Sequence, residues 1–308
     1  SGSFSVKTVG LMPTLMSLDE WADSIMQTLE NDNKTSDNWY KYALLAKQYK
    51  GRYIDLEHTT SPFGTTAFND VSDFVFDDSV DWLGSLVGNA YSTTHDISVS
   101  GGSEKISYRV SFGYLYDGSP LQYGNNNNQR YNLRTNNTCQ ITDWLKLESA
   151  IGYNRQEQVA PTNVGSMLTV LVPMPGLPLS SMNGKPYAWG TWASPTSVAE
   201  YGGDNKLSVS AINISETFKV RATKWLDANI NVGYNTSTAQ RNTVNNSVDY
   251  YNYTGTKVVL TTPTSDQSYY KQTSSRTDFY SFSGYLNGHH DFGDHSLSAT
   301  LGGQYEFK

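Results

Sequence analysis

A strand pattern occurs twice in this sequence and limits the chain to very few folds. Residues 142–154 read TDWLKLESAIGYN and residues 223–235 read TKWLDANINVGYN. In each copy a tight turn precedes a segment in which apolar and polar residues alternate. In the second copy the apolar face holds Leu226, Ala228, Ile230, Val232 and Tyr234, and the polar face holds Asp227, Asn229, Asn231 and Asn235. This pattern is typical of a transmembrane β-barrel strand, which has lipid on one side and water on the other.

The connections between the expected strands alternate between short and long. Strands are expected near 2–9, 92–100, 106–117, 130–142, 145–157, 208–222, 226–238, 273–291 and 295–308. Short turns are expected at 101–105, 143–144, 223–225 and 292–294, and long connections at 10–91, 118–129, 158–207 and 239–272. In an up-and-down meander, connections of one parity lie on one rim. Outer-membrane barrels have short periplasmic turns and long external loops, whereas a soluble sandwich has turns at both ends.

The expected strand 208–222 contains an exception to the pattern. Glu216 falls on the same face as Ile214 and Phe218. Either a β-bulge shifts the register there or a neighbouring element shields the carboxylate.

The composition argues against several other classes of protein. Only 37% of the residues are hydrophobic, and no segment has the roughly 18 consecutive apolar residues that a membrane helix needs. The net charge of −7 argues against nucleic acid as a partner, because a surface that binds nucleic acid is basic. The single cysteine, Cys139, allows no intrachain disulfide, and we expect it to be a buried small apolar residue.

The number of expected strands indicates a piece of a larger barrel. Nine strands are expected here, whereas bacterial single-chain barrels have an even number. The chain opens on a strand-like segment without the pattern of a signal peptide, and it stops within the strand-like segment 295–308. We therefore expect an all-β fold, an antiparallel up-and-down transmembrane β-barrel that is only partly present.

Several segments resemble one known family. They are HDISVSGGSEKISYRVSFGYL at 95–115, RYNLR at 130–134, TDWLK at 142–146, LMSLDEWA at 15–22 and VDW at 80–82. Together they look like the early barrel of SusC/RagA-type TonB-linked outer-membrane transporters. The resemblance covers most of residues 1–155 and continues as a general barrel pattern to residue 308.

The resemblance implies the organisation and activity of a longer parent chain. Such a parent has about 22 strands and a plug domain that fills the lumen. It lies in the outer membrane of a Gram-negative bacterium, draws energy through TonB and is lidded by a SusD-type surface lipoprotein. The plug and the remaining barrel have no counterpart in residues 1–308. Here we expect a first strand at 1–9, a partly helical external loop at 10–91, and barrel strands with external loops at 92–308.

The loop 10–91 is expected to contain helices. Ser17 and Glu20 form a capping box that opens an amphipathic helix to about Asn31. A second helix is expected at 37–50 and a third at 80–89. These helices either form a contact surface for the lid lipoprotein or only cover the rim.

No motif for catalysis or metal binding is found, so we expect neither an enzyme nor a cofactor. The histidines lack HExxH or comparable spacing, and no P-loop, GxSxG or dinucleotide-binding motif is present. Five aspartates cluster at Asp70, Asp73, Asp77, Asp78 and Asp81. They lack the alternating loop of a calcium site, and Asp78 or Ser79 fits better as a helix N-cap, although the sequence leaves calcium binding there open.

Substrate recognition is expected from the long connections and the lumen face. The candidate residues are Tyr187, Trp189, Trp192 and Tyr201 in the connection 158–207, with Arg109 and Arg134 on the lumen face. Aromatic rings suit stacking on sugars or contact with peptide side chains. The alternative is that these rings only pack the loop onto its neighbours.

Three functions remain open from the sequence. The leading one is TonB-dependent import of an oligosaccharide or a peptide across the outer membrane. The others are a passive porin or structural barrel, and a soluble glycan-binding β-domain. A plug domain upstream of the first strand distinguishes a transporter from a porin, and a requirement for detergent argues against the soluble domain.

Overall fold

The computed structural model describes most of the chain. The described residues are 16–48, 50–51, 53–55, 73–75, 80–163, 176–189, 192–263 and 265–308. The first strand expected at 1–9 lies outside them. Within this part of the chain, no helix is both long enough and apolar enough to cross a membrane.

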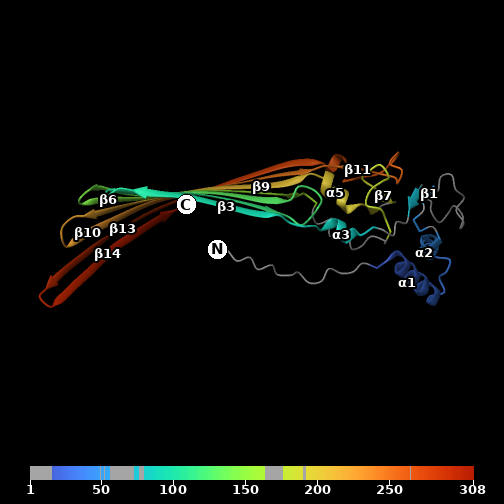
Figure 1. The fold of residues 1–308 in the computed structure, drawn as a ribbon, viewed down its shortest axis with the longest axis horizontal. Coiled ribbons are helices and arrows are strands. Elements are labelled where there is room, and N and C mark those ends of the chain that lie inside the picture. The colour runs from blue at the N-terminus through green and yellow to red at the C-terminus, as the bar shows by residue number, and fades with distance from the viewer. Residues whose placement is uncertain are drawn as a thin grey trace.

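An antiparallel sheet of eight strands forms the body of the molecule (Figure 1). The strands are β3 (Ser92–Gly102), β4 (Ile106–Gly118), β5 (Asn127–Thr142), β6 (Leu145–Pro161), β9 (Asp204–Arg221), β10 (Leu226–Asn245), β13 (Tyr269–Phe292) and β14 (His295–Phe307). Each pairs with the next of these along the chain, which makes an up-and-down meander. Among the described strands, the edges β3 and β14 do not pair with each other. The expected partial barrel is therefore confirmed.

Several strands are longer than the sequence predicts, mostly at one end of the sheet. β10 continues to Asn245, past its expected end at 238, and β13 begins at Tyr269, before its expected start at 273. Residues 236–245 of β10 are polar on both faces except for Ala239 and Val244. The alternation of apolar and polar residues ends there, although pairing with β9 and β13 continues.

The two ends of the sheet differ as the alternation of connection lengths predicts. Tight turns at 103–105, 143–144, 222–225 and 293–294 lie at one end, on the left of Figure 1. In the last of them Gly293 has a φ of 62°, a left-handed conformation that glycine adopts without strain. The longer connections lie together at the opposite end, called the loop end below.

The register sorts the side chains onto an apolar face and a polar face. On the apolar face, Ile230 lies beside Phe218, and Phe218 lies beside Leu147. This face is widely open: the exposed fraction is 50% for Ile230 and 75% for Leu301. A sheet whose apolar side chains remain exposed on one face has the surface that a barrel turns towards lipid.

The structure decides the expectations for two residues on the apolar face, Glu216 and Cys139. The register of β9 is continuous with both neighbours, so the bulge considered for Glu216 is not present. Its carboxylate stays on the apolar face and accepts a hydrogen bond of 2.7 Å from the Ser149 hydroxyl.

Cys139 is only half-buried, so the expectation of a buried thiol was wrong. Cys139 lies on the apolar face of the sheet, and the described part of the chain places no protein layer over that face.

The connections at the loop end fold into a small structured assembly. Its elements are α3 (Trp82–Leu86), β7 (Ala188–Trp189), β8 (Trp192–Ala193), α5 (Pro195–Tyr201), β11 (Val248–Tyr251), β12 (Val258–Thr262) and the 3₁₀ helix η3 (Ser265–Gln267). Ala188, Val248 and Tyr250 form a buried cluster against which Ala193 and Leu260 pack. The assembly therefore has a core of its own.

The third expected helix is shorter than predicted. Residues 80–89 were expected to be helical, but α3 covers only Trp82–Leu86. Val87 forms a β-bridge with Leu121, and the Gly88 amide donates to the Pro120 carbonyl at 2.7 Å. Pairing with the 119–126 connection therefore ends the helix early.

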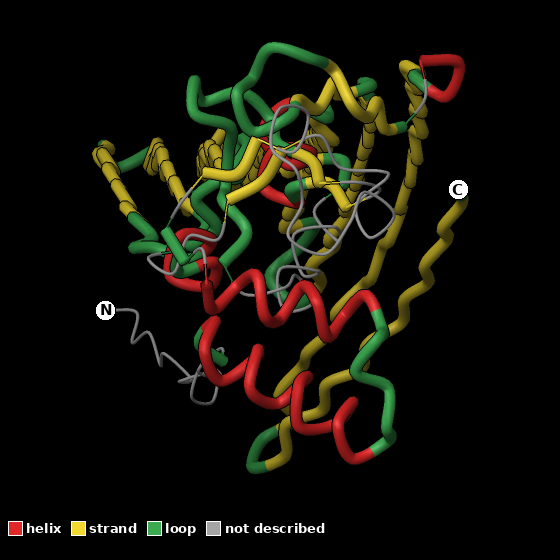
Figure 2. The backbone as a smooth tube through the Cα atoms, turned by 90° about the vertical axis from the view of Figure 1, so that its right-hand side faces the viewer, coloured by secondary structure: helices red, strands yellow, loops and turns green. Residues whose placement is uncertain are grey.

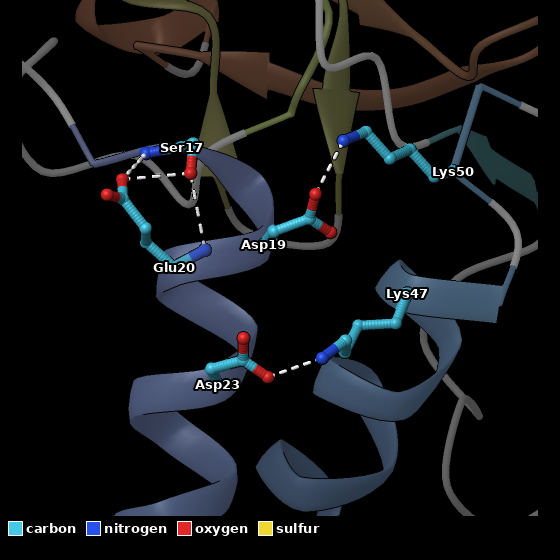
Figure 3. Close-up of polar contacts among 6 residues, drawn as sticks. All are labelled: Ser17, Asp19, Glu20, Asp23, Lys47 and Lys50. Carbon is cyan, nitrogen blue, oxygen red and sulfur yellow. Dashed lines mark hydrogen bonds and ion pairs between the residues drawn. The ribbon is translucent and has the colours of Figure 1, made fainter.

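A pair of helices, α1 (Leu18–Asn31) and α2 (Asn38–Gln48), lies in front of the strands when the molecule is viewed from the loop end (Figure 2). The predicted capping box is present: the Ser17 hydroxyl accepts from the Glu20 amide at 3.3 Å, and the Glu20 carboxylate accepts from the Ser17 amide at 2.9 Å (Figure 3). Two strands that were not predicted, β1 (Tyr53–Asp55) and β2 (Asp73–Val75), pair with each other in the same connection.

Candidate functional site

The polar face of the sheet carries rows of hydrogen-bonding side chains. The regular register aligns Asn213, Gly152, Arg134 and Ser111 in one row across four strands. The neighbouring row towards the short turns holds Ser215, Ala150, Asn136 and Arg109. Because Gly152 has no side chain, the row around Arg134 is open at its centre.

A hollow of about 640 Å³ opens on this face. Its polar lining includes Asp96, Arg109, Asn132, Arg134, Asn136 and Asn213. The two arginines predicted from the sequence are therefore brought together in one hollow. It is rich in amide groups, which both donate and accept hydrogen bonds.

Arg109 and Arg134 have no carboxylate partner among the residues that the structure describes. An arginine side chain offers five N–H donors in a planar arrangement that matches a carboxylate or a phosphate. Asn136 lies directly opposite Arg109 on the neighbouring strand. The hollow can therefore hold an anionic group and, beside it, groups that exchange hydrogen bonds with amides.

A second charged group lies on the polar face nearer to the short turns. Glu148 forms ion pairs with Lys146 at 3.0 Å and with Lys219 at 2.8 Å. All three side chains are at least one-third exposed, so these pairs contribute little to stability. Together Glu148, Lys146 and Lys219 carry one net positive charge, on a face that also carries Arg109 and Arg134.

An uncharged network completes the polar face. The Asn231 amide group donates to the Ser215 hydroxyl at 2.9 Å and to the Thr217 hydroxyl at 2.8 Å. Asn231 thus lies on the wet face, as the sequence pattern predicts, and it links β10 to β9.

Neither Tyr187 nor Tyr201, the two aromatic candidates whose side chains the structure describes, lines the hollow. Tyr187 is fully buried, and its ring meets that of Tyr253 at 6.0 Å between centroids, edge to face. Trp189 and Trp192 lie opposite each other in the β7–β8 pair, and their side chains are outside the described part. Tyr201 is 53% exposed at the end of α5. Of the two placed rings, only Tyr201 is accessible to a ligand.

The core of the loop assembly was not predicted from the sequence. Tyr250 is fully buried and donates from its hydroxyl to the Ser194 carbonyl at 3.4 Å, and burial raises the pKa of its phenol. The Ser194 hydroxyl in turn donates to the Leu179 carbonyl at 3.0 Å. One signal for α5 was available, since Ser194 followed by Pro195 is typical of a helix start.

A metal site finds no support among the described residues. No group of three or more histidine, cysteine, aspartate or glutamate side chains converges there. Asp70, Asp77 and Asp78, three of the five clustered aspartates, lie outside the described part.

Comparisons with known proteins identify the fold. No protein-family model matches the sequence, and no curated protein is significantly similar to it. Solved structures of the RagAB peptide transporter match with a TM-score of 0.67, and those of the RagAB peptide importer match with 0.65 in its closed-closed state and 0.63 in its open-open state. The chain has the fold of part of RagAB. Each match has 18% sequence identity and covers 95% of this chain.

The match with RagAB also defines what part of a transporter is present. This chain spans about a third, 32%, of the RagAB chains that it matches. The expected resemblance to a SusC/RagA-type barrel is confirmed at the level of the fold.

Proposed function

We propose that this chain is part of a TonB-dependent outer-membrane transporter that imports a nutrient, and that its role is transport and not catalysis. The observation that carries the proposal is the RagAB fold over 95% of the chain. The polar face with its hollow supports it, because a transporter needs a wet interior surface behind a lipid-facing one.

The substrate is an oligosaccharide or a peptide, and the hollow favours one that carries a carboxylate. Arg109 and Arg134 are cationic and have no described carboxylate partner, whereas a neutral sugar needs no such pair of charges. A peptide with a free C-terminus fits this chemistry, and so does an acidic saccharide. The RagAB structures are those of a peptide importer, which agrees with the first of these.

The proposed partner at the loop end is a SusD-type lipoprotein. Helices α1 and α2 present aromatic rings there: Trp39 is 51% exposed, and its ring lies 6.4 Å from that of Trp21 and 5.9 Å from that of Tyr42. Exposed tryptophan and tyrosine side chains are enriched in protein interfaces. Trp39→Ala should therefore weaken co-purification of the lipoprotein with the full-length protein, with Lys34→Ala in the exposed loop between the helices as the control.

The test of the transport proposal is uptake by cells that carry the full-length protein. Labelled short peptides and oligosaccharides should enter only when TonB is present. Arg109→Gln combined with Arg134→Gln should lower uptake of the carboxylated substrates by roughly tenfold or more, since each charged hydrogen bond lost costs about 1.5–3 kcal/mol. The matched control is Arg276→Gln, which changes an arginine on the apolar face of the same sheet.

Two results would contradict the proposal. Uptake that continues without TonB would indicate a passive porin. Equal uptake by the double variant and the control would show that Arg109 and Arg134 do not contact the substrate. Trp189→Ala, Trp192→Ala and Tyr201→Ala, made singly, then test whether the loop rings contribute, each by about 0.5–1.5 kcal/mol of binding free energy.

A further inference from the structure

Aromatic rings with polar tips gather on the apolar face towards the loop end. The rings of Tyr114 and Tyr131 lie 5.1 Å apart, and His95 stacks on Tyr114 at 6.3 Å. Aromatic side chains that have an apolar ring and a polar group at the end are enriched at the boundary between hydrocarbon and headgroups. These residues therefore mark the headgroup level of the leaflet nearest to the loops.

A groove of about 510 Å³ lies on the apolar face at this level. Its floor is formed by Phe112, Leu133 and Tyr153, which are direct neighbours across β4, β5 and β6. Phe112 and Leu133 are 42% and 46% exposed. Tyr131, which lies opposite Arg155, also lines the groove, so its surface is apolar and aromatic up to the charged residues at one end.

A charged group stands at the mouth of the groove. Arg155 follows Tyr153 on the same face of β6, and its Nε donates to the Glu157 carboxylate at 3.0 Å. Lys206 of β9 lies 3.6 Å from the same carboxylate. Two cations therefore share one anion, and both keep 45% or more of their side chains exposed.

We propose that this groove binds one phosphate-bearing lipid of the adjacent leaflet. Its acyl chain lies on Phe112, Leu133 and Tyr153, and its phosphate is held between Arg155 and Lys206. Arginine retains further N–H donors after its bonds to Glu157, and its planar geometry suits phosphate oxygens. The excess positive charge selects a phosphate over an uncharged headgroup.

The same charges disfavour a second copy of the chain as the occupant. A two-fold interface places the same surface patch on both subunits. A two-fold axis through this groove would bring the arginine and lysine pairs of the two copies together in a region of low dielectric, where like charges repel strongly. A lipid phosphate instead neutralises them.

Native mass spectrometry of the full-length protein, freed of detergent after incubation with lipid, tests the proposal. Phosphatidylglycerol should remain bound, and diacylglycerol with identical acyl chains should not. In the variant that combines Arg155→Gln with Lys206→Gln, retention of phosphatidylglycerol should fall roughly tenfold or more, because charged hydrogen bonds to the phosphate are lost. Arg241→Gln, which removes an arginine from the polar face of the loop end, is the matched control and should retain the lipid.

The comparison of the two lipids uses the unaltered protein, so it decides the matter even if a variant folds poorly. Equal retention of phosphatidylglycerol and diacylglycerol would overturn the role of the charges. Equal retention by the double variant and the control would do the same. A dimer mass that Leu133→Glu abolishes, with no lipid adduct, would assign the groove to a second copy instead.

Discussion

Ile230 and Asn235 lie on β10 and leave the strand on opposite faces. Both side chains are exposed, yet one belongs to the apolar face and the other to the polar face. At the scale of single residues, exposure does not distinguish the two surroundings. The parity of the position along the strand does, because successive side chains alternate between the faces.

Arginine at these two positions should therefore have unequal effects. Ile230→Arg in the full-length protein should destabilise the barrel in lipid by about 2–4 kcal/mol, because the charge would enter the hydrocarbon. Asn235→Arg should cost much less. Asn235 is a better control than Asn231, whose amide bridges Ser215 and Thr217. Urea unfolding from lipid vesicles measures both, and equal losses would disprove the assignment of the faces.

Glu216 provides the opposite test on the same face. Its carboxylate lies among apolar side chains with the Ser149 hydroxyl as its hydrogen-bond donor. Glu216→Leu should stabilise the barrel in lipid by up to about 2 kcal/mol. Glu148→Leu on the polar face should change the stability little, because the exposed ion pairs of Glu148 with Lys146 and Lys219 contribute little to it. Destabilisation by Glu216→Leu would instead mean that another protein surface covers this residue.

At the scale of elements, the sequence predicts best those helices and strands that carry a strong local pattern of residues. The eight strands of the main sheet were predicted because alternation marks each of them, and α1 was predicted through its capping box. The ends of β10 and β13 were missed because their polar residues carry no alternation. The β11–β12 pair was missed for another reason: its short strands are held by the buried Tyr250 and by contacts with β7, which are distant in sequence.

In the candidate site, too, residues on strands were predicted better than residues in loops. Arg109 and Arg134 were predicted because a strand's parity fixes the face of every residue on it. The burial of Tyr187 could not be predicted, because it depends on how the loop folds against Tyr253 and not on the local pattern.

The capping box of α1 should matter for the helix pair. Ser17→Ala removes the hydroxyl that accepts from the Glu20 amide and should destabilise α1 by about 1 kcal/mol. Hydrogen exchange of the amides in the first turn of α1 should accelerate accordingly in the full-length protein. Thr35→Ala, in the turn between the helices, serves as the control and should leave these amides unchanged.

The helix pair should also loosen in acid. The Lys50 ammonium lowers the pKa of the Asp19 carboxyl, and hydrogen bonds from Ser17 lower that of Glu20. Carboxyls with a lowered pKa in the folded state stabilise it above their unfolded pKa, and this contribution is lost as the pH falls through the folded pKa. The loss should therefore begin below about pH 4.

Spin labels at Gln27 and Gln48, placed in a Cys139→Ser background, measure this separation of α1 from α2. The distance distribution should broaden on acidification. Asp19→Asn should already broaden it at neutral pH, because the ion pair between Asp19 and Lys50 is lost. An unchanged distribution at both pH values in both proteins would show that the ion pairs between the helices do not hold them together.

At the scale of the whole molecule, the separation of turns and loops predicts an orientation. In the outer membrane the loop end should face the outside and the tight turns the periplasm. A cysteine introduced at Met182, which is 67% exposed, should react with a membrane-impermeant maleimide on intact cells. A cysteine at Glu104 in the β3–β4 turn should react only after the cells are opened. Labelling of Glu104→Cys on intact cells would reverse the orientation.

The length of β10 and β13 sets how far the loop assembly stands from the membrane. These strands have 20 and 24 residues, about twice the 9–11 that cross the hydrocarbon. At about 3.3 Å per residue and a tilt of about 40°, twenty residues rise roughly 50 Å, of which the apolar band takes about 25 Å. The tips therefore stand some two to three Debye lengths above the headgroups at physiological salt, since that length is about 8 Å. An incoming molecule meets the electric field of the loops, while that of the membrane surface is already screened.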